Sequence, residues 1–279
     1  MCGFLGIVTK DNKILNEYKS SLEDRLGKIS HRGPEGSKTD IGKDYAVGHV
    51  ILAIQGSKII QNQPIFNNRY LMLYNGEVFN HKFAKSTIKE FLHFKGNSNN
   101  NDDSDTPIIF NGLIQEGTDY LKNIDGFYSI FFYDKSKKKG WLIRDASGQK
   151  PLYYQFNNNS LLFASEIKGI PIDNKSINKE SLETFKAIGY IPSPKTIYTD
   201  INCLRPGEII EFSHYNDSNQ GIKKFHTRIF EIKKRRKNNN NYENNFKNLI
   251  SNKVKLNTIG NRDIAVLLSG GLDSSIVLN

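Results

Sequence analysis

The stretch MCGFLGIV, residues 1–8, decides which fold we predict for this chain. Its apolar run from Phe4 to Val8 is typical of a buried strand. Cys2, one of only two cysteines, stands directly behind Met1. If Met1 is removed, Cys2 carries a free α-amino group with a pKa of about 8, beside a thiol with a pKa of about 8.5. Such an amine can accept the thiol proton and leave a nucleophilic thiolate. The alternative is a small buried cysteine near a terminus.

The overall composition is that of a folded protein without a membrane span. The chain has 279 residues, of which 37% are hydrophobic and 24% charged, enough for one large domain or two modest ones. The apolar run after Met1 is too short for a signal peptide, and no run approaches the roughly 20 residues of a membrane span. Cys2 and Cys203 make no disulfide framework. We therefore expect a soluble, cytoplasmic protein with no membrane partner.

The net charge of +10 raises the question of a nucleic-acid partner. The basic residues are scattered, and the one dense run, 233–237, leads directly into the asparagines 238–241. No aromatic residues alternate with this run, as they do in single-strand binders. The pattern favours a compositional bias over a binding arm. A nucleic-acid binder acting through 223–237 stays as a minor alternative, which strongly salt-dependent affinity would reveal.

Apolar spacing predicts a strand-rich region with a few helices, extending to about residue 212. Helical spacing covers 14–29 and 81–94, and the polar segment 96–104 is typical of a solvated loop. Thr106 followed by Pro107 indicates a helix start, with the threonine as the cap. Alternating or continuous apolar runs predict strands at 4–8, 45–54, 69–74, 126–134, 140–145, 151–156 and 161–165.

The pattern changes after this region, which suggests three segments: 1–212, 213–245 and 246–279. The middle one is a basic, Asn-rich connection with one short strand near 225–232. The last begins with a helix near 243–256 and continues with a buried strand, Ile264–Leu268, that leads into a glycine turn. Since no second strand follows, this unit cannot close a βαβ motif. We expect it to be the incomplete start of a second domain.

Two further stretches carry side chains that are suited to catalysis or ligand binding. YNGEVFN, residues 74–80, contains an Asn-Gly pair that is common in tight turns. It is also suited to an oxyanion hole, in which the Asn75 amide and the Gly76 backbone N–H face a developing negative charge. Asp105, before the predicted helix, is on its own more typical of a solvated loop residue than of a ligand. HRGPEG, residues 31–36, indicates only a loop.

Taken together and in this order, these stretches resemble the class II glutamine amidotransferases, which are N-terminal-nucleophile hydrolases. The nearest match is the amidotransferase domain of the glutamine-hydrolysing asparagine synthetases. The resemblance implies an α+β fold, a four-layer αββα sandwich, followed by the beginning of an α/β ATP-pyrophosphatase-type domain. It is carried by MCGFLGI, HRGP, NGEVFN, SDT, RDASGQKPLYY, FASEIK, PSPKTIY, LRPGE and LLSGGLDSS.

The resemblance also implies roles for individual residues. Cys2 would be the nucleophile, and Asn75 and Gly76 would form the oxyanion hole. Asp105 and Glu77 would hold the α-ammonium group of glutamine, with Arg32 as a further substrate-binding residue. The glutaminase step would need no cofactor and no metal. A phosphate loop for the ATP and Mg²⁺ of a synthetase step would comprise Ser269, Gly270, Gly271, Asp273 and Ser274.

The chain departs from the family pattern at the predicted carboxylate site. Asparagine synthetases usually have an arginine where this chain has Ile51, and that arginine binds the α-carboxylate of the substrate. A charge-assisted hydrogen bond contributes about 1.5–3 kcal/mol, so its loss would weaken binding about 10- to 150-fold. Arg32 and Arg69 are near enough in sequence to substitute. Pro107 also replaces an acid that normally follows the helix-entry aspartate by two residues.

The resemblance predicts an enzyme that hydrolyses glutamine to glutamate and ammonia. The ammonia would serve ATP-dependent amidation of aspartate or a related carboxylate, in asparagine biosynthesis, by a ligase half that is largely absent from this chain. The expected partners are glutamine and a separate or missing synthetase domain. The alternative is a catalytically impaired scaffold or regulatory relic of such an enzyme.

Overall fold

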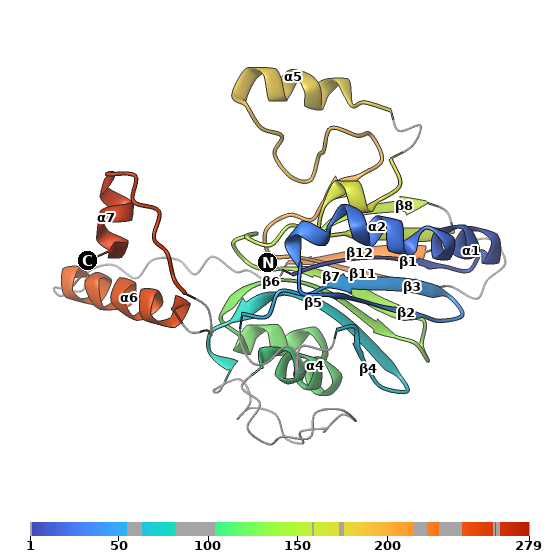
Figure 1. The fold of residues 1–279 in the computed structure, drawn as a ribbon, viewed down its shortest axis with the longest axis horizontal. Helices are drawn as coiled ribbons and strands as arrows, with labels where there is room; N and C mark the ends of the chain where they lie inside the picture. The colour runs from blue at the N-terminus through green and yellow to red at the C-terminus, as the bar shows by residue number, and fades with distance from the viewer. Residues whose placement is uncertain are drawn as a thin grey trace.

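The body of the molecule consists of two six-stranded sheets whose named strands all pair antiparallel, as the computed structural model shows (Figure 1). The structure describes residues 2–54, 63–81, 104–157, 159–172, 176–214, 222–228, 242–258, 260 and 263–278. The strand order of the first sheet is β10-β8-β9-β1-β3-β2. Its strands are β1 Gly3–Thr9, β2 Ser37–Ile41, β3 Tyr45–Val50, β8 Tyr153–Asn157, β9 Ser160–Ala164 and β10 Asn202–Cys203.

The second sheet has the order β12-β11-β7-β6-β5-β4. Its last strand, β12, pairs with β11 and overlaps the short strand predicted near 225–232, of which 229–232 lie outside the described residues. The sheet therefore continues beyond residue 212, where the sequence suggests a change of segment. Its strands are β4 Ile65–Phe66, β5 Tyr70–Val78, β6 Gly126–Asp134, β7 Lys139–Arg144, β11 Glu208–His214 and β12 Ile222–Arg228.

The two sheets pack face to face through an aromatic core. Phe131 of the second sheet stacks on Phe163 of the first, with ring centroids 4.2 Å apart, and both belong to one fully buried cluster. Helices α1 (Asn12–Ser20) and α2 (Leu22–Lys28) cover the outer face of the first sheet, and α4 (Asp105–Glu116) covers that of the second (Figure 1). This helix–sheet–sheet–helix layering agrees with the predicted α+β sandwich.

Three helices lie outside these layers: α5 (Lys179–Ile188), α6 (Tyr242–Asn257) and α7 (Leu272–Leu278) (Figure 1). α6 confirms the helix predicted near 243–256. The buried strand predicted at Ile264–Leu268 is wrong, because these residues form no strand and Leu267 is 94% exposed. A strand needs a neighbour for its backbone hydrogen bonds, and no described strand pairs with this stretch. No helix among the described residues has the length and apolarity to cross a membrane.

Other element boundaries differ from the predictions for local reasons. The single helix expected at 14–29 is divided at Ser21, whose φ of −108° and ψ of 6° leave the helical range. The helix predicted to be capped by Thr106 begins two residues earlier than expected, at Asp105, with Ser104 as its N-cap. The predicted helix 81–94 falls almost entirely, and the basic run 233–237 entirely, outside the described residues.

Candidate active site

Cys2 lies directly before β1, the strand between β3 and β9 in the first sheet. Its thiol donates a hydrogen bond to the Leu52 carbonyl oxygen, and the Leu52 backbone N–H donates to the sulfur, both at 3.3 Å. The strand predicted at 45–54 therefore stops at Val50, and the residues that follow turn to contact the thiol. Cys2 is half-buried, and the structure records it as a free thiol.

The HRGPEG loop contacts both the backbone of Cys2 and the segment that contacts its thiol. Arg32 donates from Nε to the Cys2 carbonyl oxygen at 3.1 Å. Further along the loop, Glu35 N–H donates to the Ile51 carbonyl oxygen, and Ile51 N–H donates to the Gly36 carbonyl oxygen, at 3.1 and 2.8 Å. One loop thus holds the backbone of the cysteine and the segment that contacts its sulfur.

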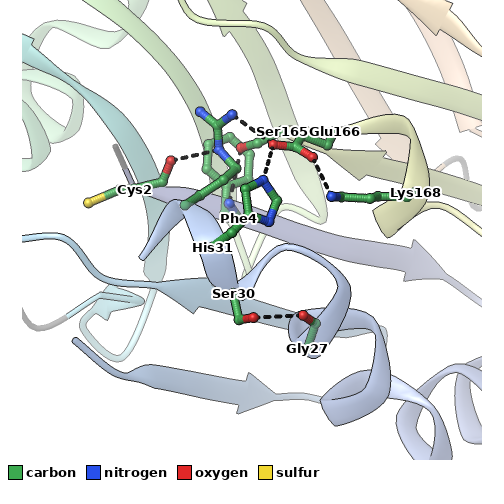
Figure 2. Close-up of polar contacts among 9 residues, drawn as sticks. Cys2, Phe4, Gly27, Ser30, His31, Ser165, Glu166 and Lys168 are labelled. Carbon is green, nitrogen blue, oxygen red and sulfur yellow. Dashed lines mark hydrogen bonds and ion pairs between the residues drawn. The ribbon is translucent and has the colours of Figure 1, made fainter. Parts of the chain in front are cut away.

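Arg32 is itself held by Glu166, which follows β9. Its Nη1 donates to the Glu166 carboxylate at 3.0 Å, and His31 and Lys168 contact the same carboxylate at 2.9 and 3.2 Å. Figure 2 shows the Cys2 carbonyl turned toward this group and the thiol turned away from it. Burial acts to raise the pKa of Glu166, but the three hydrogen bonds outweigh it, so the pKa lies below the usual value. The carboxylate stays charged and orients the guanidinium.

Asn75 and Gly76 lie within β5, so the tight turn weighed from the sequence is wrong. They pair with Ser129 and Tyr128 of β6. The Asn75 side chain is 1% exposed, and its Nδ2 has no hydrogen-bond partner among the described residues. A buried amide donor without a partner is costly, so this one is suited to a ligand atom.

Glycine at 76 follows from strand packing as well as from chemistry. A Cβ there would lie 2.7 Å from the Tyr128 Cβ and closer still to the Phe127 carbonyl oxygen. The peptide just before Asn75 is fixed by His49, which is fully buried and donates from Nε2 to the Tyr74 carbonyl oxygen at 3.1 Å.

Asp105 is buried at the start of α4, so a solvated loop residue is excluded. Its Oδ2 accepts hydrogen bonds from the Tyr74 hydroxyl at 2.6 Å and from the Val78 backbone N–H at 2.9 Å. Burial raises the pKa of the Asp105 carboxyl above its ordinary value, although these two hydrogen bonds act to lower it. Burial also raises the pKa of the Cys2 thiol, and the carboxylates of Glu77 and Asp105 add to that effect. Cys2, Arg32, Glu77 and Asp105 thus converge at one place, with two negative charges in electrostatic reach of the sulfur.

The structure shows which of the residues considered for binding the substrate α-carboxylate lie near Cys2. Ile51 is buried and apolar. Arg69 lies at the far end of β5, five residues from Tyr74, and both its Nε and Nη2 donate to Asp134. At about 3.3 Å per residue, Arg69 is more than about 15 Å from the site. Of the two arginines named from the sequence, only Arg32 reaches Cys2.

The predicted phosphate-loop residues lie at the start of α7: Ser269, Gly270 and Gly271 precede the helix, and Asp273 and Ser274 stand in its first turn. The hydroxyls of Ser269 and Ser274 lie 3.0 Å apart, and the Gly271 backbone N–H donates to the Ser269 hydroxyl. Gly270 has a φ of +77°, which glycine adopts without strain. α7 has only seven residues and is exposed along most of its length. The turn offers hydroxyl and backbone donors that suit phosphate oxygens, and its role with ATP stays a prediction.

Several residues at the site were not found from the sequence. Three of them contact predicted residues across long sequence separations: Leu52 contacts Cys2, Tyr74 contacts Asp105 and Glu166 contacts Arg32. The fourth, His49, contacts Tyr74. No local pattern marks contacts so distant along the chain. The available signals were that Glu166 lies in FASEIK and Tyr74 in YNGEVFN, two quoted stretches in which these two residues were assigned no role.

Residues 1–225 match the model of the glutamine amidotransferase domain family. A relative in Methanocaldococcus jannaschii is 29% identical, over all of this chain and 56% of that protein. Asparagine synthetase (glutamine-hydrolysing) 3 of Bacillus subtilis is 25% identical and asparagine synthetase B (glutamine-hydrolysing) of Escherichia coli 26%, each over 99% of this chain and 44% of that protein. The chain thus spans about half the length of these curated relatives.

A likeness also exists among solved structures. The glutamine phosphoribosylpyrophosphate amidotransferase of B. subtilis aligns with a TM-score of 0.49 and 18% sequence identity. The alignment covers 80% of this chain and 49% of that one.

Proposed function

Because the chain belongs to the glutamine amidotransferase domain family, we propose that it hydrolyses the side-chain amide of glutamine, with Cys2 as the nucleophile. After removal of Met1, the α-amine of Cys2 accepts the thiol proton. The thiolate attacks the amide carbon, and the carbonyl oxygen becomes an oxyanion that the Asn75 amide and the Gly76 N–H stabilise. The ammonium ion formed from the amine then protonates the leaving nitrogen. Ammonia departs, and a γ-glutamyl thioester remains on Cys2.

Water completes the reaction. The α-amine removes a proton from the water as it attacks the thioester, and the proton passes to the departing sulfur. The products are glutamate and ammonia, and Cys2 returns to its starting state. Glu77 and Asp105 hold the α-ammonium group of the substrate throughout, because two carboxylates beside the nucleophile suit a cationic group.

The observation that carries this proposal is the unpartnered Asn75 Nδ2 in the buried strand β5. A purely structural asparagine at this depth would satisfy its amide with a neighbour. An oxyanion hole requires a donor that stays vacant until the reaction supplies an oxygen. Among the described residues, Asn75 meets that requirement in the strand that also carries Gly76 and Glu77.

We further propose that the ammonia serves an asparagine-synthetase-type amidation of a carboxylate, driven by ATP. The names of the bacterial relatives support this step. The chain covers less than half of each of those two proteins, so the acceptor and the ATP step belong to the proposal alone.

The test combines intact mass with product analysis. We expect the mature protein to lack Met1, to gain one equivalent of an electrophilic glutamine analogue at Cys2, and to release glutamate from glutamine. Cys2→Ala should abolish both reactions. Cys203→Ser, which changes the other free cysteine, should retain them. Retained Met1, or no glutamate even at tens of millimolar glutamine, would contradict the proposal and favour the scaffold alternative.

A further inference from the structure

Only two of the described lysines and arginines are buried, Arg32 at 8% exposure and Lys150 at 6%. Burying a positive charge is costly unless a negative group compensates it. Both side chains lie in electrostatic reach of each other and of Cys2. In a chain with a net charge of +10, whose other cations with described side chains are partly or fully exposed, the convergence of two buried cations near Cys2 requires an explanation.

Lys150 is fixed at its backbone and free at its tip. It lies between β7 and β8, where its N–H donates to Asp145 at 3.0 Å and its carbonyl oxygen accepts from Arg144 Nε at 3.0 Å. Its ammonium group lies 4.6 Å from the centre of the Phe127 ring. The ammonium group makes no ion pair or hydrogen bond with any described residue. A cation–π contact uses none of its three N–H donors, so they are available to a ligand.

Arg32 presents a second vacant donor. Its Nε and Nη1 bind the Cys2 carbonyl oxygen and Glu166, whereas Nη2 is buried and has no partner among the described residues. Two buried cations with vacant donors are suited to an anion. The substrate proposed above is a zwitterion, and its α-carboxylate needs such a partner that neither Ile51 nor the distant Arg69 supplies.

We propose that Lys150, together with Nη2 of Arg32, binds the α-carboxylate of glutamine, so that carboxylate recognition comes from the loop after β7 and not from residue 51. The inference rests on the proposed function. Its geometry is supported by Glu77, which pairs with Phe127 across β5 and β6 and lies in electrostatic reach of Lys150. The ammonium and carboxylate groups share one carbon atom, so their counter-charges on the protein have to be neighbours.

A pair of substrates tests this assignment. 4-Aminobutanamide differs from glutamine only in having a hydrogen in place of the α-carboxylate. We expect the wild type to prefer glutamine in kcat/KM, measured by ammonia release, by about 10- to 150-fold, the range of one charge-assisted hydrogen bond. Lys150→Met should lose most of that preference through a higher KM for glutamine, because only Nη2 of Arg32 remains for the carboxylate. Its kcat/KM for 4-aminobutanamide should stay within about twofold of the wild-type value.

Two further variants complete the design. Lys150→Gln keeps a polar tip on a side chain one atom shorter, so this variant provides the test if Lys150→Met does not fold. Lys186→Met removes an exposed lysine of α5 that pairs with Glu183 and should keep the preference in full. A preference that survives in both Lys150 variants would overturn the assignment while leaving the proposed function intact. A wild type that hydrolyses neither substrate would overturn the proposed function itself.

Discussion

The Cys2 thiol lies where burial and two carboxylates all disfavour its ionisation. These effects keep its pKa above the ordinary value in the free protein. The ammonium group of a bound glutamine would offset the charges of Glu77 and Asp105. We therefore expect substrate binding to lower the thiol pKa, so that the nucleophile becomes reactive when its substrate is present.

Glu77→Gln tests the electrostatic part of this view. Removing a negative charge near the sulfur stabilises the thiolate, so the thiol pKa should fall. The rate of Cys2 alkylation by iodoacetamide should then rise at lower pH than in the wild type. Peptide mass spectrometry at a series of pH values measures this for Cys2 separately from Cys203.

The matched control is Glu180→Gln, which removes an exposed carboxylate that pairs with Lys195 on the surface. It should leave the pH profile of Cys2 unchanged. A profile that is the same in the Glu77 variant and the wild type would show that Glu77 does not influence the thiol.

Single residues were predictable where a motif carried them. Cys2, Asn75 and Asp105 stand in short stretches whose chemistry can be read locally, and the structure brings Cys2 and Asp105 together. Lys150 was not singled out, although it stands in the quoted motif RDASGQKPLYY, because nothing in a sequence marks a lysine as buried. Glu166 was missed since its partner Arg32 lies more than a hundred residues away.

At the scale of elements, the close approach of β5 and β6 depends on Gly76. Gly76→Ala would press a methyl group against the backbone of Phe127 and against Tyr128. We expect a loss of about 1–3 kcal/mol in the free energy of unfolding, the usual range for overpacking. Glutamine hydrolysis should fall by about 100-fold, because a displacement near 1 Å in an active site has that effect. Urea unfolding and steady-state kinetics measure the two effects.

Gly27→Ala is the matched control, because a Cβ at Gly27 in α2 would meet no atom within 4 Å. Replacing a helical glycine by alanine contributes about 0.5–1 kcal/mol of stability. This variant should therefore be slightly more stable and fully active. Equal behaviour of the two alanine variants would refute the packing argument for Gly76.

Element boundaries were less predictable than element types. The helical spacing of 14–29 was correct, but the break at Ser21 has no marker in the apolar pattern. The apolar run 264–268 has the composition of a buried strand, yet strand formation depends on a partner that no described residue supplies. Periodicity reports which face an element would bury and says nothing about what is available to cover it.

For the molecule as a whole, His49 should make stability depend on pH. Burial lowers its pKa to about 4, against about 6.5 for an unfolded histidine. Between these values the unfolded chain binds more protons, so the free energy of unfolding rises with pH and falls as acid is added. For this residue alone we expect a loss of about 2 kcal/mol between pH 7 and pH 5.

Urea unfolding of His49→Gln across this range should show a shallower dependence on pH than the wild type, whatever its absolute stability. A slope in His49→Gln equal to that of the wild type would assign the pH dependence to other groups.

The architecture of the whole molecule was predicted through the resemblance of its motifs. The strand-rich pattern was compatible with several antiparallel folds and did not distinguish among them. The register of strand pairing could not be predicted from the sequence, because β1 pairs with β9 across more than a hundred residues. Sheet order depends on such distant pairings, and local patterns carry no information about them.

The central position of β1 has a consequence for synthesis. During translation its first neighbour, β3, follows within about fifty residues, whereas β9, on its other side, leaves the ribosome only after Ala164 is made. Until then the nascent sheet has an open edge beside the leading strand. Contacts so distant along the chain slow folding, and exposed edges invite pairing with other chains. If Cys2 acts as proposed, the removal of Met1 that it requires has this interval before β9 pairs with β1.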